Sequence, residues 1–345
     1  MIRFLISSPY TLSLYPAVIM SKLKLVFLGT PAIACGFLRD LFAAGHQISG
    51  VISQPDKAKG RGLKVRRPPV KDEADRLCLE TCQPASGAEL KETLERLKPD
   101  LSVVVAYGRL IEEDALRVPS LGFVNVHFSL LPQYRGAAPV QWALINGETR
   151  TGVTVFWMDK GLDTGPVCAS SEVPIEPRDD ARSLFARLEV EGSRLLRGAL
   201  ENIAKGEIIK KPQEGSPSYA PRLTLEHSWL DFSLSAKKNY DKIRGLSCGP
   251  RARFLAGASA SGGRVAVQVL KATLAGEPAA PLSAANGCVC AIERGKGFFI
   301  KCSGSSLLIE EVQPEGGRPQ KASDFLNGLR LKPGDMLAIT AANSE

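Results

Sequence analysis

The sequence predicts an α/β domain built on a Rossmann-like parallel sheet, followed by a smaller β-rich domain. In the first half, short apolar runs alternate with segments whose apolar residues recur at helical spacing, the pattern of parallel strands joined by crossover helices. In the second half, short runs are separated by Gly and Pro, which is typical of a small barrel. A chain of 345 residues is long enough for two domains, each with its own core.

The first 20 residues precede this pattern and differ from it. They are apolar, with one Arg and no acidic residue, so a weak targeting segment is one interpretation. They lack a clear basic region and a small-residue cleavage site, and Pro9 and Pro16 interrupt the run. We therefore expect residues 1–20 to be an extension upstream of a start at Met20.

The predicted first domain, residues 21–205, opens on a β-α-β unit. Lys24–Pro31 is a strand that ends in a Gly turn, a helix follows over 37–42, and Ile48–Ile52 is a second strand. A dinucleotide site would need G-x-G-x-x-G in the turn from Gly29 to Gly36 and an acidic residue at the end of the second strand. The sequence has neither feature, so a nicotinamide cofactor is not expected.

A strongly basic segment follows the second strand. From Asp56 to Lys71 there are seven Lys or Arg, and Asp56 is the single acid. Gly60 and Gly62 flank Arg61, which favours a mobile loop over a helix. A solvated charged loop is the plain alternative, but the charge imbalance after a strand end favours an anion-binding loop.

The remaining elements of this domain continue the alternation. In chain order they are a helix over Leu90–Leu97, strands over Leu101–Val105, Phe123–Val126 and Gly152–Met158, and an amphipathic helix from about Ala181 to Lys205. Because helices flank the strands on both sides, we expect the sheet to be parallel.

Asn125 and His127 are the strongest candidates for chemistry. Two residues apart on a strand, they point to the same face, at the end where open α/β sheets bind ligands. An amide donor beside a titratable imidazole suits reactions at a carbonyl carbon. A structural histidine is the plain alternative, and from position alone it is the commoner case.

Asp163, between Gly161 and Gly165, lies on a loop that can approach a ligand closely, although such an Asp is usually a turn former.

The second half of the sequence predicts a linker followed by a small barrel. Residues 206–221 are rich in Pro, Gly, Lys and Ser and form the expected linker, and residues 222–345 form the second domain. Its expected elements are a short helix near 236–246 and strands over Val265–Val269, Cys288–Ile292, Gly297–Cys302 and Ser306–Ile309. Such short strands predict an OB-like barrel. From Arg222 onward sixteen Lys and Arg face eleven Asp and Glu, which fits an RNA platform and, nearly as well, a generic basic domain.

Composition narrows the functional classes. A hydrophobic fraction of 44% and a charged fraction of 23% are ordinary for a globular protein, and a net charge of +8 suggests an anionic partner. The eight Cys form no CxxC pair and there are only three His, which argues against a zinc site and for reduced thiols in a cytosolic-type compartment. After residue 20, no stretch of the sequence reaches membrane-spanning length.

The stretch Asn125-Val-His-Phe-Ser-Leu-Leu-Pro, followed by Tyr-Arg-Gly-Ala-Ala-Pro, resembles the signature of the formyltetrahydrofolate-dependent formyltransferases. With its continuation Val-Gln-Trp it is most similar to the branch that acts on methionyl-tRNA. The resemblance implies formyl transfer from 10-formyltetrahydrofolate to the methionine amino group of initiator methionyl-tRNA, without a metal. It implies a catalytic set of Asn125, His127 and Asp163. The folate pocket that it implies is formed by Ala106, Tyr107, Ser129, Leu130, Leu131 and Pro132.

The basic segment resembles the inserted loop with which these enzymes hold the acceptor end of the tRNA, and Arg61 matches the central Arg of that loop. The tRNA contacts implied by the resemblance are Lys57, Lys59, Arg61, Lys64, Arg66 and Arg67. The second domain, as an OB-like barrel, is implied to bind tRNA as well. We expect a monomeric cytoplasmic enzyme, or an organellar one if residues 1–20 are a targeting segment.

The resemblance is strongest over Val103–Pro166 and weak after Gly249. Phe128 stands where the family usually has a small residue, a difference that could reshape the pocket beside His127. Gln133 stands where a basic residue is usual, which removes one phosphate contact.

Two other functions are consistent with parts of the sequence. A related formyltransferase acting on a small amine, such as an amino sugar or a purine precursor, needs no basic insert, so Lys57–Lys71 argues against it. A non-enzymatic RNA-binding protein that retains the fold needs no catalytic set, so Asn125, His127 and Asp163 argue against that alternative.

Overall fold

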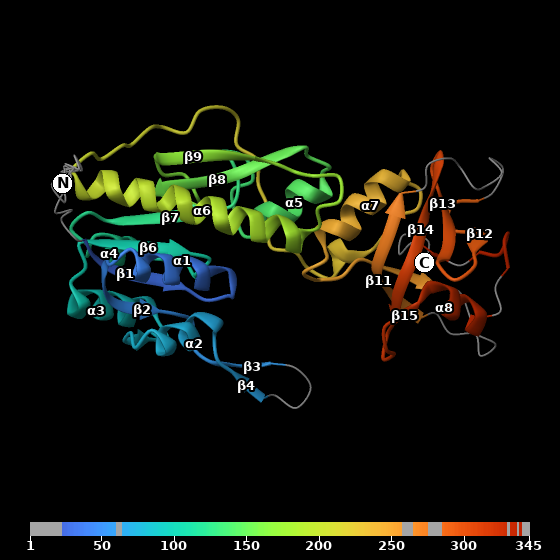
Figure 1. Cartoon of the computed structure of the whole chain (residues 1–345), viewed down its shortest axis with the longest axis horizontal. Coiled ribbons are helices and arrows are strands. Elements are labelled where there is room, and N and C mark those ends of the chain that lie inside the picture. Colours follow the sequence, from blue (N-terminus) through green and yellow to red (C-terminus); the bar gives the residue numbers. More distant parts are fainter. Residues whose placement is uncertain are drawn as a thin grey trace, which may run out of the picture.

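The computed structural model describes residues 23–59, 64–256, 265–274, 285–329, 332–336 and 338–339. The predictions for residues 1–20 and for Arg61 lie outside these ranges. Figure 1 shows two bodies along the long axis: an α/β body that ends with α6 (Ala181–Ala204) and a β-rich body that begins with α7 (Ala236–Gly245). Among the described residues, no helix combines the length and the apolar character needed to cross a membrane.

The first sheet has seven strands in the order β5-β2-β1-β6-β7-β8-β9. Their bounds are β5 (Thr81–Cys82), β2 (Gln47–Ile52), β1 (Lys24–Gly29), β6 (Leu101–Val105), β7 (Phe123–His127), β8 (Arg150–Trp157) and β9 (Val167–Pro174). The strands from β5 to β7 run parallel, as predicted. β8 and β9 run antiparallel to their neighbours, so the expectation of a wholly parallel sheet is wrong at this edge. The loop 158–166 that joins β8 to β9 is too short for a parallel crossover.

The apolar runs of the central strands are explained by two cores, one on each face of the sheet. In β1, Leu25 and Phe27 point into one core while Val26 and Leu28 point into the other. The first face is covered by α1 (Ile33–Ala43), α5 (Pro139–Ile145) and α6, and the second by α3 (Gly87–Leu97) and α4 (Glu113–Leu116). Helix α6 begins at Ala181 because the Asp180 carboxylate accepts hydrogen bonds from the backbone N–H groups of Arg182 and Ser183.

The described part of the basic segment forms secondary structure where a loop was predicted, while residues 60–63 lie outside the described residues. It contains an antiparallel hairpin of β3 (Lys57–Lys59) and β4 (Lys64–Arg66), followed by α2 (Pro69–Arg76). Figure 1 shows the hairpin projecting from the α/β body, clear of the seven-stranded sheet. Pro69 at the first helical position explains why α2 begins there.

The second body is built on an antiparallel sheet in the order β12-β13-β14-β11-β10-β16, with β15 paired to β14. The bounds are β10 (Arg253–Ala256), β11 (Val265–Leu274), β12 (Val289–Glu293), β13 (Gly297–Cys302), β14 (Ser305–Pro314), β15 (Gln320–Lys321), α8 (Ala322–Leu329) and β16 (Ala338–Ile339). A separate core lies between this sheet, α7 and α8, around Phe254 and Phe298. The chain near Met336 bridges to Cys288 before β16 pairs with β10, so it contacts both edges of the sheet.

The segment predicted as a linker is docked onto the α/β body. The Trp157 indole N–H donates to the Ile209 carbonyl at 2.8 Å, and Lys211 forms a β-bridge with Val167. Further along, Tyr219 forms a β-bridge with Arg135. The segment therefore runs beside the loops that follow β7 and β8, which places it within reach of the site.

The two bodies also contact each other directly through α5 and α7. A Cβ on Gly245 would lie 2.8 Å from Ile145 Cγ1, so glycine is required for this close helix approach. Beside it, the Arg244 guanidinium donates to buried Asp241 at 2.8 Å and to the Asp179 carbonyl at 3.1 Å. The second contact crosses from the β-rich body to the α/β body.

Candidate active site

His127 is the last residue of β7, at the edge of the sheet where the parallel strands end. Its Nε2 lies 2.9 Å from the carbonyl oxygen of Tyr134, which can only accept, so this nitrogen carries the proton in the neutral ring. Its Nδ1 lies 3.7 Å from Asp163 Oδ2. Both side chains are largely buried, with 7% and 12% of their surfaces exposed. One ring nitrogen is therefore held by the backbone, and the other faces a carboxylate.

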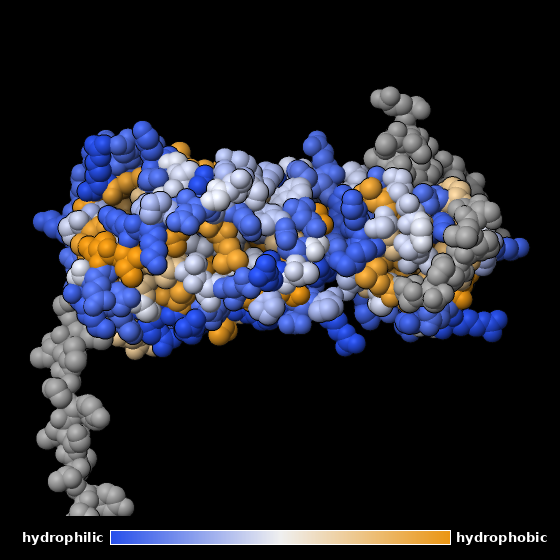
Figure 2. Space-filling model, turned by 90° about the horizontal axis from the view of Figure 1, so that it is seen from above, coloured by the Kyte–Doolittle hydropathy of each residue, from blue (hydrophilic) through white to orange (hydrophobic). Residues whose placement is uncertain are grey.

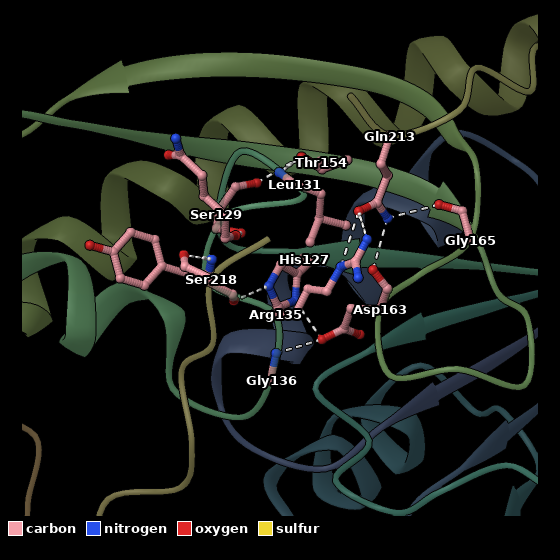
Figure 3. A network of polar contacts seen from close by, with 12 residues as sticks. His127, Ser129, Leu131, Arg135, Gly136, Thr154, Asp163, Gly165, Gln213 and Ser218 are labelled. Atoms are coloured by element: carbon pink, nitrogen blue, oxygen red, sulfur yellow. Dashed lines mark hydrogen bonds and ion pairs between the residues drawn. The ribbon is translucent and has the colours of Figure 1, made fainter. Parts of the chain in front are cut away.

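Asp163 is brought to His127 by the loop between β8 and β9. Its backbone φ of 53° lies in the left-handed region, which is unusual for a residue other than glycine and signals local strain. The Gly136 N–H donates to Asp163 Oδ2 at 2.7 Å. Figure 3 shows this contact beside the His127 ring, so the carboxylate bridges the loops that follow β7 and β8.

Asn125 lies on the same face of β7 as His127, two residues earlier. The side chain is half-buried, and its Oδ1 is buried without a hydrogen-bond partner among the described residues. An unpartnered amide oxygen at this edge can accept a hydrogen bond from a bound molecule at small cost. The structure thus brings Asn125, His127 and Asp163 to one edge of the sheet.

The loop after β7 is held by a dense set of contacts. Thr154 of β8 donates its hydroxyl to the Ser129 carbonyl at 2.7 Å and accepts from the Leu131 N–H at 3.2 Å. The Tyr134 hydroxyl donates to Glu148 Oε1 at 2.6 Å. Burial raises the pKa of Tyr134 to about 12, and the hydrogen bond to Glu148 acts in the same direction. This phenol is a structural anchor that stays protonated at neutral pH.

The residues predicted to form the folate pocket follow β6 and β7, which are neighbours in the sheet. Their loops therefore lie at the same edge. Ala106 is exposed and Leu130 and Leu131 are half-buried, so these three have side-chain surface available. Tyr107, Ser129 and Pro132 are buried and can shape a pocket only as its supporting wall.

The structure answers the question that the sequence left open about Phe128. Phe128 does not lie in the pocket beside His127, because its side chain alternates to the opposite face of the strand. It is buried in the core, edge-on to Phe37 at 6.1 Å and to Phe185 at 6.0 Å between ring centroids. Gln133, the other departure, is exposed.

Three residues around this site were given no role from the sequence: Arg135, which lies within the quoted motif, Gln213 and Ser218. Gln213 accepts from Arg135 and donates to backbone carbonyls of the loop that carries Asp163. The Ser218 hydroxyl accepts from the Tyr134 N–H at 2.8 Å. Two of them lie in a polar stretch without periodicity, where no sequence signal marks an inward-facing residue.

The basic residues differ in how available their charges are. Arg67 is paired with Asp72 at 2.9 Å and with Asp75, and the hydrogen bond to Asp75 raises its pKa. Lys71 is paired with Asp56 at 3.1 Å. Arg66 is exposed. The charge imbalance seen in the sequence is therefore partly neutralised on the α2 side of the hairpin.

No group of three or more His, Cys, Asp or Glu placed to hold a metal ion occurs among the residues that the structure describes. The functional groups gathered at the end of β7 are the imidazole of His127, the carboxylate of Asp163 and the amide of Asn125. Their arrangement can stabilise a developing oxyanion and move a proton.

Comparisons with known proteins agree with this chemistry. Residues 23–200 match the family model for formyl transferase, and residues 222–330 match the model for the formyl transferase C-terminal domain. The methionyl-tRNA formyltransferase of Elusimicrobium minutum is 37% identical over 334 residues, covering 91% of this chain and 99% of the relative. That of Geobacter sulfurreducens is 39% identical, covering 92% and 98%.

Two solved structures share the fold. An N-formyltransferase from Helicobacter canadensis, in complex with folinic acid and dTDP-3-aminofucose, has a TM-score of 0.61 at 20% identity and covers 83% of this chain and 98% of its own. HypX from Aquifex aeolicus, in complex with tetrahydrofolic acid, has a TM-score of 0.63 at 18% identity. It covers 91% of this chain, which spans about half (49%) of the HypX chain.

Proposed function

Because this chain belongs to the methionyl-tRNA formyltransferase family, we propose that it transfers a formyl group from 10-formyltetrahydrofolate to the amino group of methionine on initiator methionyl-tRNA, for translation initiation. The observation that supports this most strongly is the His127–Asp163 pair, 3.7 Å apart beside Asn125 at the carboxyl edge of the sheet. Formyl transfer needs an oxyanion stabiliser and a route for the amine proton, and these side chains supply both.

In the proposed reaction, the methionine nitrogen attacks the formyl carbon and forms a tetrahedral oxyanion. The Asn125 amide donates a hydrogen bond to that oxygen, an interaction worth about 3–4 kcal/mol in comparable sites. The bond between the formyl carbon and the folate nitrogen then breaks, and that nitrogen takes up a proton. Support for this role comes from the position of Asn125 at the carboxyl edge of the sheet and from its Oδ1, which has no hydrogen-bond partner among the described residues.

His127 can act only through Nδ1, since Nε2 is engaged by the Tyr134 carbonyl. When Nδ1 gains a proton, the charged ring lies between that carbonyl and the Asp163 carboxylate, and both acceptors stabilise it. Asp163 thereby orients the imidazole and can take the amine proton through a water molecule. Proton transfer of this kind typically contributes about 10²–10⁴-fold to the rate.

We propose that the folate lies against Ala106, Leu130 and Leu131, the members of the predicted pocket with side-chain surface available. Tyr107, Ser129 and Pro132 support this wall from behind. The Tyr107 carbonyl accepts from Thr30 and from Gln54, each at 2.8 Å, which fixes the backbone next to Ala106. The backbone at this point of the proposed pocket wall is therefore held by the fold itself.

The acceptor end of the tRNA is proposed to bind along the hairpin of β3 and β4. The projection of this hairpin from the sheet supports the idea, as does the exposed Arg66. The proposed contacts are Lys57, Lys59, Arg61, Lys64, Arg66 and Arg67. The second domain is proposed to complete an OB-like barrel that binds tRNA, supported by the antiparallel sheet whose two edges the chain near Met336 contacts. We further propose that the enzyme acts as a monomer in the cytoplasm.

The test is a formylation assay that compares methionine-charged initiator tRNA, free methionine and a small amino sugar as acceptors, with 10-formyltetrahydrofolate as the donor. The proposal expects product on the charged tRNA alone. Preferential formylation of a small amine would instead support the related small-substrate enzymes. Absence of formylation with every acceptor would support a binding protein that retains the fold.

A further inference from the structure

Gln213 occupies an unusual position in the segment that precedes the second domain. Within residues 205–217, all of which the structure describes, every other residue is exposed, whereas Gln213 is half-buried. Its side chain points inward between the loop that follows β7 and the loop that carries Asp163, as Figure 3 shows. A polar side chain that turns inward from an exposed segment loses hydrogen bonds to water, so it needs hydrogen-bond partners within the protein.

The Gln213 amide forms four hydrogen bonds that fix its orientation. Its Oε1 accepts from Arg135 Nη2 at 2.6 Å and from Arg135 Nε at 3.2 Å. Its Nε2 donates to the carbonyl of Asp163 at 2.8 Å and to that of Gly165 at 2.9 Å. A rotated amide would turn its NH₂ group against a cation and its oxygen against two carbonyls, so only this orientation satisfies all partners.

One of these hydrogen bonds is made to the backbone of Asp163, the residue of the loop whose conformation is strained. Asp163 has a positive φ of 53°, a conformation that persists only when its surroundings enforce it. Gln213 holds the backbone carbonyl of Asp163, while the Gly136 N–H holds its carboxylate. The residue is thus fixed at both ends, and the carboxylate oxygen Oδ2 that accepts from Gly136 also lies 3.7 Å from His127 Nδ1.

Docking of the segment does not depend on Gln213. Val167 and Lys211 exchange backbone hydrogen bonds at 2.7 and 2.9 Å, and the Trp157 indole holds the Ile209 carbonyl at 2.8 Å. Beyond Gln213, the backbone N–H of Arg135 donates to the Ser218 carbonyl at 2.8 Å. These contacts lie on both sides of Gln213 and do not involve its side chain. The four hydrogen bonds of Gln213 are therefore not needed to attach the segment to the α/β body.

We propose that Gln213 is a positioning residue for formyl transfer, which holds the Asp163 backbone so that the carboxylate faces His127. This inference rests on the proposed function, because it assigns Gln213 an effect on catalysis through Asp163. Gln213 itself touches neither the formyl group nor the amine. Its removal should lower kcat and leave the KM values for both substrates nearly unchanged.

The experiment compares Gln213→Ala and Gln213→Glu with Glu214→Ala, an exposed neighbour that serves as the control. The alanine variant loses the contacts to both Arg135 and Asp163. The glutamate variant keeps its acceptors for Arg135 but has no N–H to donate to the two carbonyls. We expect kcat to fall about 10- to 100-fold in both, as misplacement of a catalytic group by less than about 1 Å would cause. The control should keep the parental kcat, and all three should keep KM within about twofold.

A double-mutant cycle with Asp163→Asn separates positioning from general structure. If Gln213 acts through Asp163, the Gln213→Ala change should have little further effect on kcat in the Asp163→Asn background. Independent, multiplying losses would overturn the proposal. So would a parental kcat in Gln213→Glu, which would show that only the Arg135 contact matters. A rise in KM with a lowered Tm in both Gln213 variants would likewise overturn it, in favour of a purely structural role.

Failure of this inference can be told apart from failure of the proposed function. A near-parental kcat in Asp163→Asn alone would refute the catalytic set whatever Gln213 does. A strong loss in Asp163→Asn with no loss in Gln213→Ala would refute the positioning role alone.

Discussion

Gly136 offers a quantitative test of how the Asp163 carboxylate is held. Its φ of 123° is strained for any L residue, which costs about 1–2 kcal/mol. A Cβ there would also lie 2.7 Å from the backbone oxygen of Ala220, so the loop must shift. The shift weakens the 2.7 Å hydrogen bond from the Gly136 N–H to the carboxylate, a charge-assisted bond worth about 1.5–3 kcal/mol. We therefore expect Gly136→Ala to lower stability by about 3–5 kcal/mol.

Gly215 provides the matched control for this prediction. Its φ is 97°, yet a Cβ at this position would meet no atom within 4 Å. Gly215→Ala should therefore show the backbone strain alone, about 1–2 kcal/mol. Thermal or urea unfolding measures both variants, and the difference corresponds to a Tm about 4–12 °C lower for Gly136→Ala. In addition, Gly136→Ala should lower kcat at least tenfold. Equal destabilisation of the two variants, with parental kcat in both, would refute the account of how Asp163 is held.

Three further outcomes follow from the structure. Arg66→Ala should weaken tRNA binding and flatten its salt dependence more than Arg67→Ala, because Arg67 is already paired with two carboxylates; binding titrations at several salt concentrations measure both. Leu131→Trp should weaken binding of 10-formyltetrahydrofolate more than binding of tRNA, and equal weakening in the two titrations would indicate misfolding instead. Tyr134 has a folded pKa of about 12, above its value of 10 in the unfolded chain, so it stabilises the fold below pH 10 and this contribution is lost as pH rises toward 12. Unfolding measured across that range should be less pH-dependent in Tyr134→Phe than in the parent, and an unchanged dependence would contradict the buried phenol.

The parts of the fold that were predicted well have strong local signals. The apolar run at Leu101–Val105 is buried on both faces, so it stands out as a strand whatever its neighbours. The helix predicted from Ala181 by its amphipathic pattern is confirmed, and the structure shows that Asp180 caps its start. By contrast, β9 alternates between buried and exposed residues at the edge of the sheet and lacks an apolar run, so it was not predicted.

The geometry of the candidate site could be predicted only where its residues lie on one strand. Asn125 and His127 share a face because of strand geometry, which the sequence alone specifies. The contact of His127 with Asp163 joins the end of β7 to a loop 36 positions later, and it was expected only from the resemblance to a family. Gln213 was missed because its inward orientation depends on how a polar segment docks onto the α/β body. The pairing of Arg67 with Asp72 and Asp75 depends on where α2 begins, so the sequence alone could not show that this charge is partly neutralised.

The most direct test of the central claim is single-turnover formylation of methionine-charged initiator tRNA by His127→Ala, Asn125→Ala and Asp163→Asn. Binding of tRNA and folate is measured alongside for each variant. We predict rate losses of about 10²-fold or more in each, with binding retained, and combined losses far smaller than the product of the single ones. A near-parental rate in His127→Ala would contradict the proposed role of the pair that His127 forms with Asp163.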